Sequence, residues 1–78
     1  MSKELIKNLE SKIEALVIAI PREQDAYEFY LELSEEYEDK ASKEMFAYLA
    51  KQEMQHKKNL ENILRGLEVQ LEEAKKNK

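Results

Sequence analysis

Apolar residues recur along the first half of the chain at alternating spacings of four and three positions. The series consists of Leu9, Ile13, Leu16, Ile20, Tyr27, Tyr30 and Tyr37. It keeps a heptad spacing when Glu23 and Ser34 are counted as members. This spacing is typical of one face of a long helix that packs against another helix. We therefore predict a helix over about residues 3–38.

Pro21 falls inside this series. A proline donates no backbone hydrogen bond, and its ring clashes with the carbonyl group four residues earlier in a helix. Because the apolar series keeps its phase on both sides of Pro21, we predict a single helix with a kink at Pro21.

A second apolar series runs through the other half of the chain. Its members are Phe46, Leu49, Leu60, Ile63, Leu67 and Ala74, and Glu53 and His56 fall in the same series. Asp39 is a good N-cap, so we predict a second helix over about residues 40–75. Gly66 lies inside this helix, and because the pattern resumes at Leu67 we expect a close-packing position there.

The two helices predict one all-α domain over residues 1–78, an antiparallel two-helix hairpin. A chain of 78 residues with one glycine and one proline has no room for a second domain. A hairpin of this size leaves an apolar stripe uncovered. We therefore expect it to dimerise and so complete a four-helix bundle.

Three polar residues interrupt the apolar series. A turn near residues 39–40 places Glu23 level with His56, and Glu53 lies one helical turn from His56 on the same face. A buried carboxylate is costly unless a partner compensates its charge. A metal ion would do so, and a buried polar network that fixes the helix register is the alternative.

Two copies of the chain would bring these residues together twice, giving four carboxylates and two imidazoles. Four negative charges balance two divalent cations. Ligation by oxygen with one nitrogen per metal suits iron or manganese, and the lack of sulfur disfavours structural zinc.

Charge and composition exclude several other functions. The formal net charge is −4, and basic residues are scattered among acidic ones, so we expect no nucleic-acid partner. The chain has no cysteine and therefore neither a disulfide nor a thiolate metal site. Its first residues, MSKELIKNLE, lack the apolar run of a signal peptide or membrane span, so we expect no membrane partner and a cytoplasmic location.

Two stretches resemble a known family: AIPREQDAYEFY and FAYLAKQEMQHKKNLENIL. They are similar to the rubrerythrin branch of the ferritin-like superfamily, in particular to half-length members related to encapsulated ferritins. The resemblance covers roughly residues 15–65 and rests on Glu23, Ala26, Tyr30, Glu53 and His56.

The resemblance implies a ferroxidase that oxidises Fe(II) with dioxygen or peroxide at a dimer interface. Glu53 would bridge two metals, Glu23 and His56 would be terminal ligands, and Tyr30 would lie just outside the ligand set. Two irons per dimer are implied, with manganese as the alternative. The assembly would be a homodimer or a larger even-numbered homo-oligomer such as a decameric ring.

The chain departs from the family pattern in two places. It lacks the four cysteines of a rubredoxin-like centre, so a role in scavenging oxygen or peroxide would need a separate electron donor. It ends in LEEAKKNK without an evident docking sequence, which argues against residence in an encapsulin shell. The scavenger and a purely structural helical hairpin are the alternatives to the ferroxidase.

Overall fold

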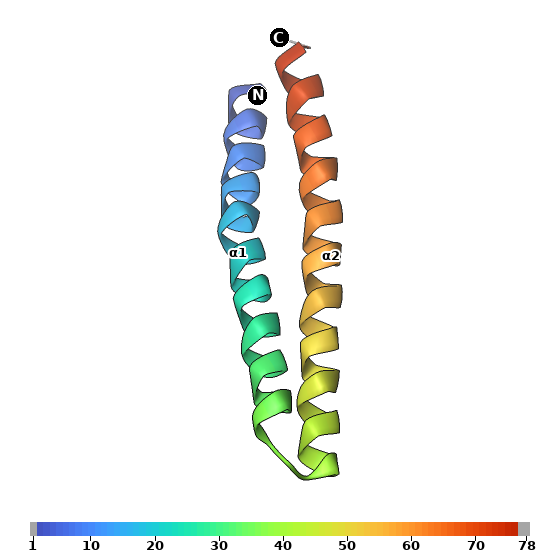
Figure 1. Cartoon of the computed structure of the whole chain (residues 1–78). Coiled ribbons are helices and arrows are strands. Elements are labelled where there is room, and N and C mark those ends of the chain that lie inside the picture. The colour runs from blue at the N-terminus through green and yellow to red at the C-terminus, as the bar shows by residue number, and fades with distance from the viewer. Residues whose placement is uncertain (1, 77–78) are drawn as a thin grey trace.

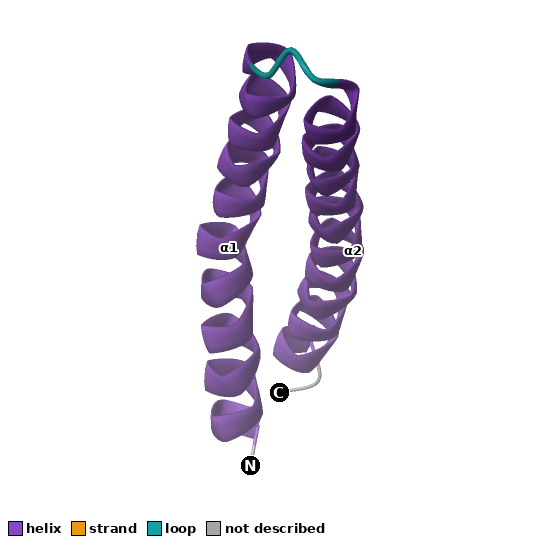
Figure 2. Cartoon of the chain, turned by 90° about the horizontal axis from the view of Figure 1, so that it is seen from below, coloured by secondary structure: helices purple, strands orange, loops and turns teal. Residues whose placement is uncertain are grey.

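The computed structural model describes residues 2–76, which form two long helices packed side by side (Figure 1). Helix α1 spans Ser2–Glu36 and helix α2 spans Lys40–Lys76. A short loop joins them at one end of the molecule, as Figure 2 shows. The described residues contain no strand, so the prediction of an all-α antiparallel hairpin is confirmed. The molecule is a rod with extents of 59 × 14 × 12 Å.

The helix ends lie close to the predicted positions. Helix α1 ends at Glu36 and α2 ends at Lys76, differences of one or two residues that are normal at fraying helix ends. Helix α1 runs through Pro21 without interruption, and Pro21 is exposed. The kink at Pro21 stays a prediction.

Side-chain contacts fix the turn between the helices. The Asp39 carboxylate accepts a 2.9 Å hydrogen bond from the backbone N–H of Ser42, which confirms Asp39 as the N-cap of α2. The hydrogen bonds from Ser42 lower the pKa of Asp39. Lys43 donates a 3.2 Å hydrogen bond from Nζ to the carbonyl oxygen of Ser34, which ties the last turn of α1 to the first turn of α2.

Aromatic rings pack the end of the hairpin next to the turn. The ring of Phe46 on α2 lies between two tyrosines, with centroid distances of 5.2 Å to Tyr37 and 6.5 Å to Tyr30. Both pairs are stacked, which is a favourable arrangement for aromatic side chains. These contacts hold the end of α1 in register with the first turns of α2.

The hairpin buries very little of its apolar surface. Among the described residues, only Leu9 and Ala50 are fully buried. Ten large apolar side chains are exposed: Leu5, Val17, Ile18, Phe29, Leu31, Tyr37, Met45, Tyr48, Ile63 and Val69. Two helices form a single layer, and a single layer leaves both of its sides open.

The structure corrects part of the predicted series on α2. His56 and Ile63 are exposed, whereas Ala50, Lys57 and Leu64 face α1. The predicted series runs through His56 and Ile63, and the observed series runs through Lys57 and Leu64, one position later. Both have spacings of three and four residues, so the spacing alone does not show which series faces α1. In the structure, α1 packs against the series through Lys57 and Leu64, which leaves His56 and Ile63 on one side of the hairpin.

Gly66 also differs from the expectation. A Cβ atom added to Gly66 would meet nothing within 4 Å, so Gly66 is not a close-packing position within this chain.

The two sides of the hairpin carry different residues. We call the side that contains Ala15, Phe29, Met45, His56 and Ile63 the histidine face. It includes a shallow groove of about 430 Å³ lined by Lys12, Ala15, Leu16, Ile63 and Leu67. The opposite side carries another groove, lined in part by Tyr27, Leu31 and Met54.

Candidate metal centre

Three potential metal ligands meet in the middle of the hairpin. Glu23 comes from α1, and Glu53 and His56 come from α2. One donor atom from each side chain lies within 4.8 Å of the other two. The antiparallel pairing of the helices produces this convergence, since it sets Glu23 level with the turn of α2 that carries the other two residues.

The distances describe a loose triangle around the imidazole. Nδ1 of His56 lies 3.6 Å from a carboxylate oxygen of Glu23 and 3.7 Å from one of Glu53. The two glutamate side chains are 27% and 22% exposed, whereas the histidine side chain is 57% exposed. The carboxylates therefore lie between the helices, and the imidazole lies at the edge of the histidine face.

The electrostatics of the cluster are unfavourable without a cation. Oxygen Oε2 of Glu23 is buried and has no hydrogen-bond partner. Hydrogen bonding with the Glu23 carboxyl group, burial and repulsion from Glu23 raise the pKa of Glu53, and His56 opposes this effect. Two carboxylates that repel each other, one with an orphaned oxygen, are the pattern that a bound cation would relieve.

The donor set fits a divalent metal that prefers oxygen. Two carboxylates and one imidazole offer oxygen and nitrogen but no sulfur, which suits iron or manganese. One chain provides only three ligand residues, and the histidine face is open beside His56. The three residues of one chain are half of the six ligands that a paired-metal carboxylate site uses.

Tyr30 lies apart from this cluster. It is seven residues after Glu23, which places it about 10 Å further along α1 toward the turn. Its ring stacks on Phe46, and none of the hydrogen bonds among the described residues joins its hydroxyl group to the cluster. Within one chain, Tyr30 is thus a packing residue near the turn, and its role beside the ligands stays a prediction.

A polar contact that the sequence did not suggest adjoins the cluster. Lys57 donates a 2.8 Å hydrogen bond from Nζ to the side-chain oxygen of Gln24, across the two helices. Gln24 in turn donates a 2.7 Å hydrogen bond to Glu28. Each of Gln24 and Lys57 directly follows a cluster residue, so the contact fixes the register of α1 against α2 beside the cluster. The only signal in the sequence was their adjacency to Glu23 and His56.

Fold and site together define a class of protein. A helical hairpin with one glutamate on α1 and a Glu-x-x-His motif on α2, converging between the helices, carries half of the ligand inventory of a four-helix carboxylate metal bundle. The family model described as Rubrerythrin matches residues 14–78, so the chain belongs to the rubrerythrin family. The match includes all four residues predicted for the site and confirms the resemblance seen in the sequence. Comparison with curated proteins and with solved structures gave no match.

Over the part of the chain that the structure describes, neither helix has a stretch long and apolar enough to cross a bilayer.

Proposed function

We propose that this chain is a ferroxidase-type protein that oxidises Fe(II) with dioxygen or peroxide at a site shared between two copies. The observation that carries the proposal is the convergence of Glu23, Glu53 and His56 around an orphaned carboxylate oxygen. Membership of the rubrerythrin family supports the same chemistry. The absence of cysteine is in keeping with activity in the cytoplasm.

The proposed pairing uses the histidine face. A second copy placed there about a two-fold axis would cover Ile63 and bring its own cluster beside the first, giving four carboxylates and two imidazoles. Four negative charges balance two divalent ions, whereas one chain alone provides an incomplete set of ligands. The open groove beside Ile63 offers the apolar surface that such pairing needs.

Each residue then has a distinct task. The carboxylates of Glu23 and Glu53 would hold the two Fe(II) ions and offset their charge, with Glu53 as the bridging ligand. The imidazole of His56 would bind as a neutral nitrogen donor. Lys57 and Gln24 would keep the two helices in register, which fixes the distance between Glu23 and the α2 ligands.

The redox chemistry belongs to the substrate. Two Fe(II) ions each give up one electron, and dioxygen or peroxide accepts both. The contribution of the protein is to position the pair of ions and leave coordination positions open for the oxidant. Because the side chains of the cluster are oxygen-rich, they also favour the more highly charged ferric product.

Oxygen consumption after Fe(II) addition tests the proposal. Glu53→Ala and His56→Ala should lose iron binding and oxygen uptake, because each substitution removes a ligand from both halves of the site. Glu68→Ala is a matched control, since Glu68 is an exposed acidic residue on α2. Helical content measured by circular dichroism should be retained in all three variants.

The outcomes separate the proposal from its alternatives. A purely structural hairpin would keep the same metal content in Glu53→Ala and His56→Ala as in the wild type. A scavenger would consume peroxide in steady turnover only when an electron donor is added. Loss of iron-dependent oxygen uptake in the two ligand variants, without loss in Glu68→Ala, is the result that we expect.

A further inference from the structure

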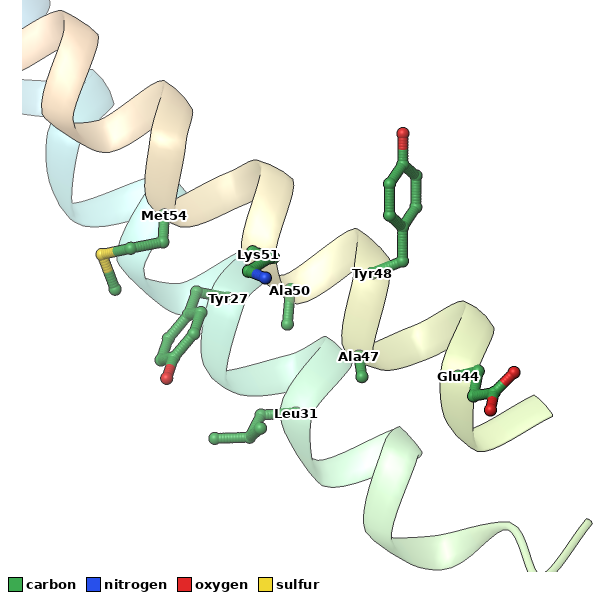
Figure 3. A pocket seen from close by; sticks show the side chains of 8 residues that line it. All are labelled: Tyr27, Leu31, Glu44, Ala47, Tyr48, Ala50, Lys51 and Met54. Atoms are coloured by element: carbon green, nitrogen blue, oxygen red, sulfur yellow. The ribbon is translucent and has the colours of Figure 1, made fainter. Parts of the chain in front are cut away.

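A second groove lies on the side of the hairpin away from His56 (Figure 3). It has a volume of about 580 Å³ and is lined by Tyr27, Leu31, Glu44, Ala47, Tyr48, Ala50, Lys51 and Met54. Met54 is two residues from His56, and Leu31 is two residues from Phe29. Two residues apart on a helix means a rotation of about 200°, so the groove and the histidine face look in opposite directions. We call this side the groove face.

The floor of the groove is apolar. Figure 3 shows Tyr27 and Leu31 extending from α1 and Ala47, Ala50 and Met54 lying along α2. Leu31 and Tyr48 are exposed in the single chain. A copy bound at the histidine face would leave this side uncovered, because the hairpin is one layer thick. The groove therefore needs an occupant other than the one that completes the metal centre.

Charges at the rim of the groove indicate what that occupant is. Glu44 and Lys51 both line the groove and lie seven residues apart on the same stripe of α2. They are placed symmetrically about a point between Ala47 and Tyr48. A two-fold axis through this point would run the two α2 helices antiparallel and set Glu44 of each copy level with Lys51 of the other. A positive and a negative residue at mirror positions make the surface complementary to itself.

Among the described residues, Lys51 makes no ion pair, and the one ion pair of Glu44 is weak. Glu44 lies 3.9 Å from Lys40, but both side chains are mostly exposed, and such a pair contributes little to stability. Ala47 and Ala50 are small, which lets a second helix approach closely above the groove floor.

We propose that the groove face binds a second copy of this chain about a two-fold axis near Ala47, with Glu44 of one copy paired with Lys51 of the other. This interface is separate from the pairing proposed for the metal centre, and only the size of the full assembly and its iron content rest on that proposed function. A chain that uses both faces forms an assembly of at least four copies with an even number of subunits.

Charge reversal tests the pairing directly. Glu44→Lys and Lys51→Glu should each weaken association on the order of tenfold or more, because either one creates two like-charged contacts across the axis. The double variant Glu44→Lys/Lys51→Glu should restore the wild-type mass in solution. Glu32→Lys is the control, since it makes the same charge change at an exposed position outside the groove.

Iron content distinguishes this interface from the metal centre. The single reversals should reduce an assembly of four or more copies to a dimer that still binds two irons. The proposal is overturned if the wild type is no larger than a dimer that the reversals leave unchanged. It is also overturned if the double variant associates no better than the single ones.

A cysteine cross-link places the axis. The chain has no cysteine, so one introduced thiol reports only on contact between identical positions. Under mild oxidation Ala47→Cys should form a disulfide-linked dimer, because Ala47 lies beside its own copy at the axis. Ser11→Cys, exposed on α1 and outside the groove, should remain uncross-linked. Equal cross-linking of the two variants would contradict the proposed axis.

Discussion

Glu23 and Glu53 meet between two helices without a cation among the described side chains that neutralises them both. Over residues 2–76, the only basic group within 4.0 Å of the two carboxylates is the imidazole of His56, which is charged only when protonated. Burial and mutual repulsion make this cluster a cost to the metal-free hairpin. A function that needs the carboxylates explains why that cost is present.

The raised pKa of Glu53 gives a pH-dependent prediction. A carboxyl group whose pKa is raised by folding stabilises the fold below its ordinary pKa, and this contribution is lost as the pH rises through the raised value. Metal-free Glu53→Gln should therefore unfold at a higher temperature than the wild type at neutral pH. The difference should shrink as the solution is acidified, since the wild-type carboxyl group is then protonated. Thermal unfolding in the presence of a chelator measures both, and a neutral-pH loss of stability in Glu53→Gln would contradict the account.

Ionisation of Glu53 should strengthen metal binding, although it destabilises the metal-free fold. A carboxylate must lose its proton to bind a metal, so iron affinity should fall as the pH is lowered toward the raised pKa of Glu53. A titration of iron binding across mildly acidic and neutral pH measures the effect. An affinity that does not change over this range would exclude Glu53 as a ligand.

At the scale of the helices, specific side-chain hydrogen bonds hold the turn between α1 and α2, whereas a glycine is tolerated in the middle of α2. Asp39 caps α2, and Lys43 bridges back to α1, so the turn is held by side chains of its own. The middle of α2 accepts a glycine at Gly66 without any neighbour that requires one.

Gly66→Ala should stabilise the helix. Alanine is favoured over glycine inside a helix by about 1 kcal/mol, which corresponds to an increase of about 4–8 °C in the melting temperature of a domain of this size. The space for the added methyl group is free within the chain. Thermal unfolding measures the change, and a lower melting temperature would show instead that another chain packs against Gly66.

Asp39→Ala should destabilise the hairpin at neutral pH, because it removes the acceptor for the backbone N–H of Ser42. The pKa of Asp39 is lowered in the fold, so its contribution is present above the ordinary pKa and is lost as the pH falls through the lowered value. The gap in melting temperature between wild type and variant should therefore narrow in acid. Glu38→Ala, which alters the neighbouring exposed acid, is the control.

At the scale of the whole molecule, exposed apolar residues divide into those that an assembly would cover and those that it would not. Ile63 lies on the histidine face and is 52% exposed. Val69 is 55% exposed and lies on the side of α2 that faces away from α1. Ile63→Asp should abolish pairing at the histidine face and, with it, iron binding, so that only association through the groove face remains. Val69→Asp should affect neither, although the two residues are equally exposed in the single chain. Solution mass and iron content of the two variants measure this, and identical behaviour would exclude the histidine face as the interface.

Much of this architecture could be predicted from the sequence because heptad spacing and an N-cap act locally. The two helices, their antiparallel arrangement and the level of Glu23 against His56 followed from spacing and the turn. The side of α2 that faces α1 could not be predicted in this way, because the series through His56 and the series through Lys57 have the same periodicity. The contact between Lys57 and Gln24 depends on that choice, so it too required the structure.

We predict that the metal centre is complete only when two copies of the chain meet. Metal analysis combined with solution mass, on protein purified without added zinc and compared with and without Fe(II), tests it most directly. We expect a dimer or a larger even-numbered assembly that contains two irons for every two chains. A monomer that takes up no metal would contradict it.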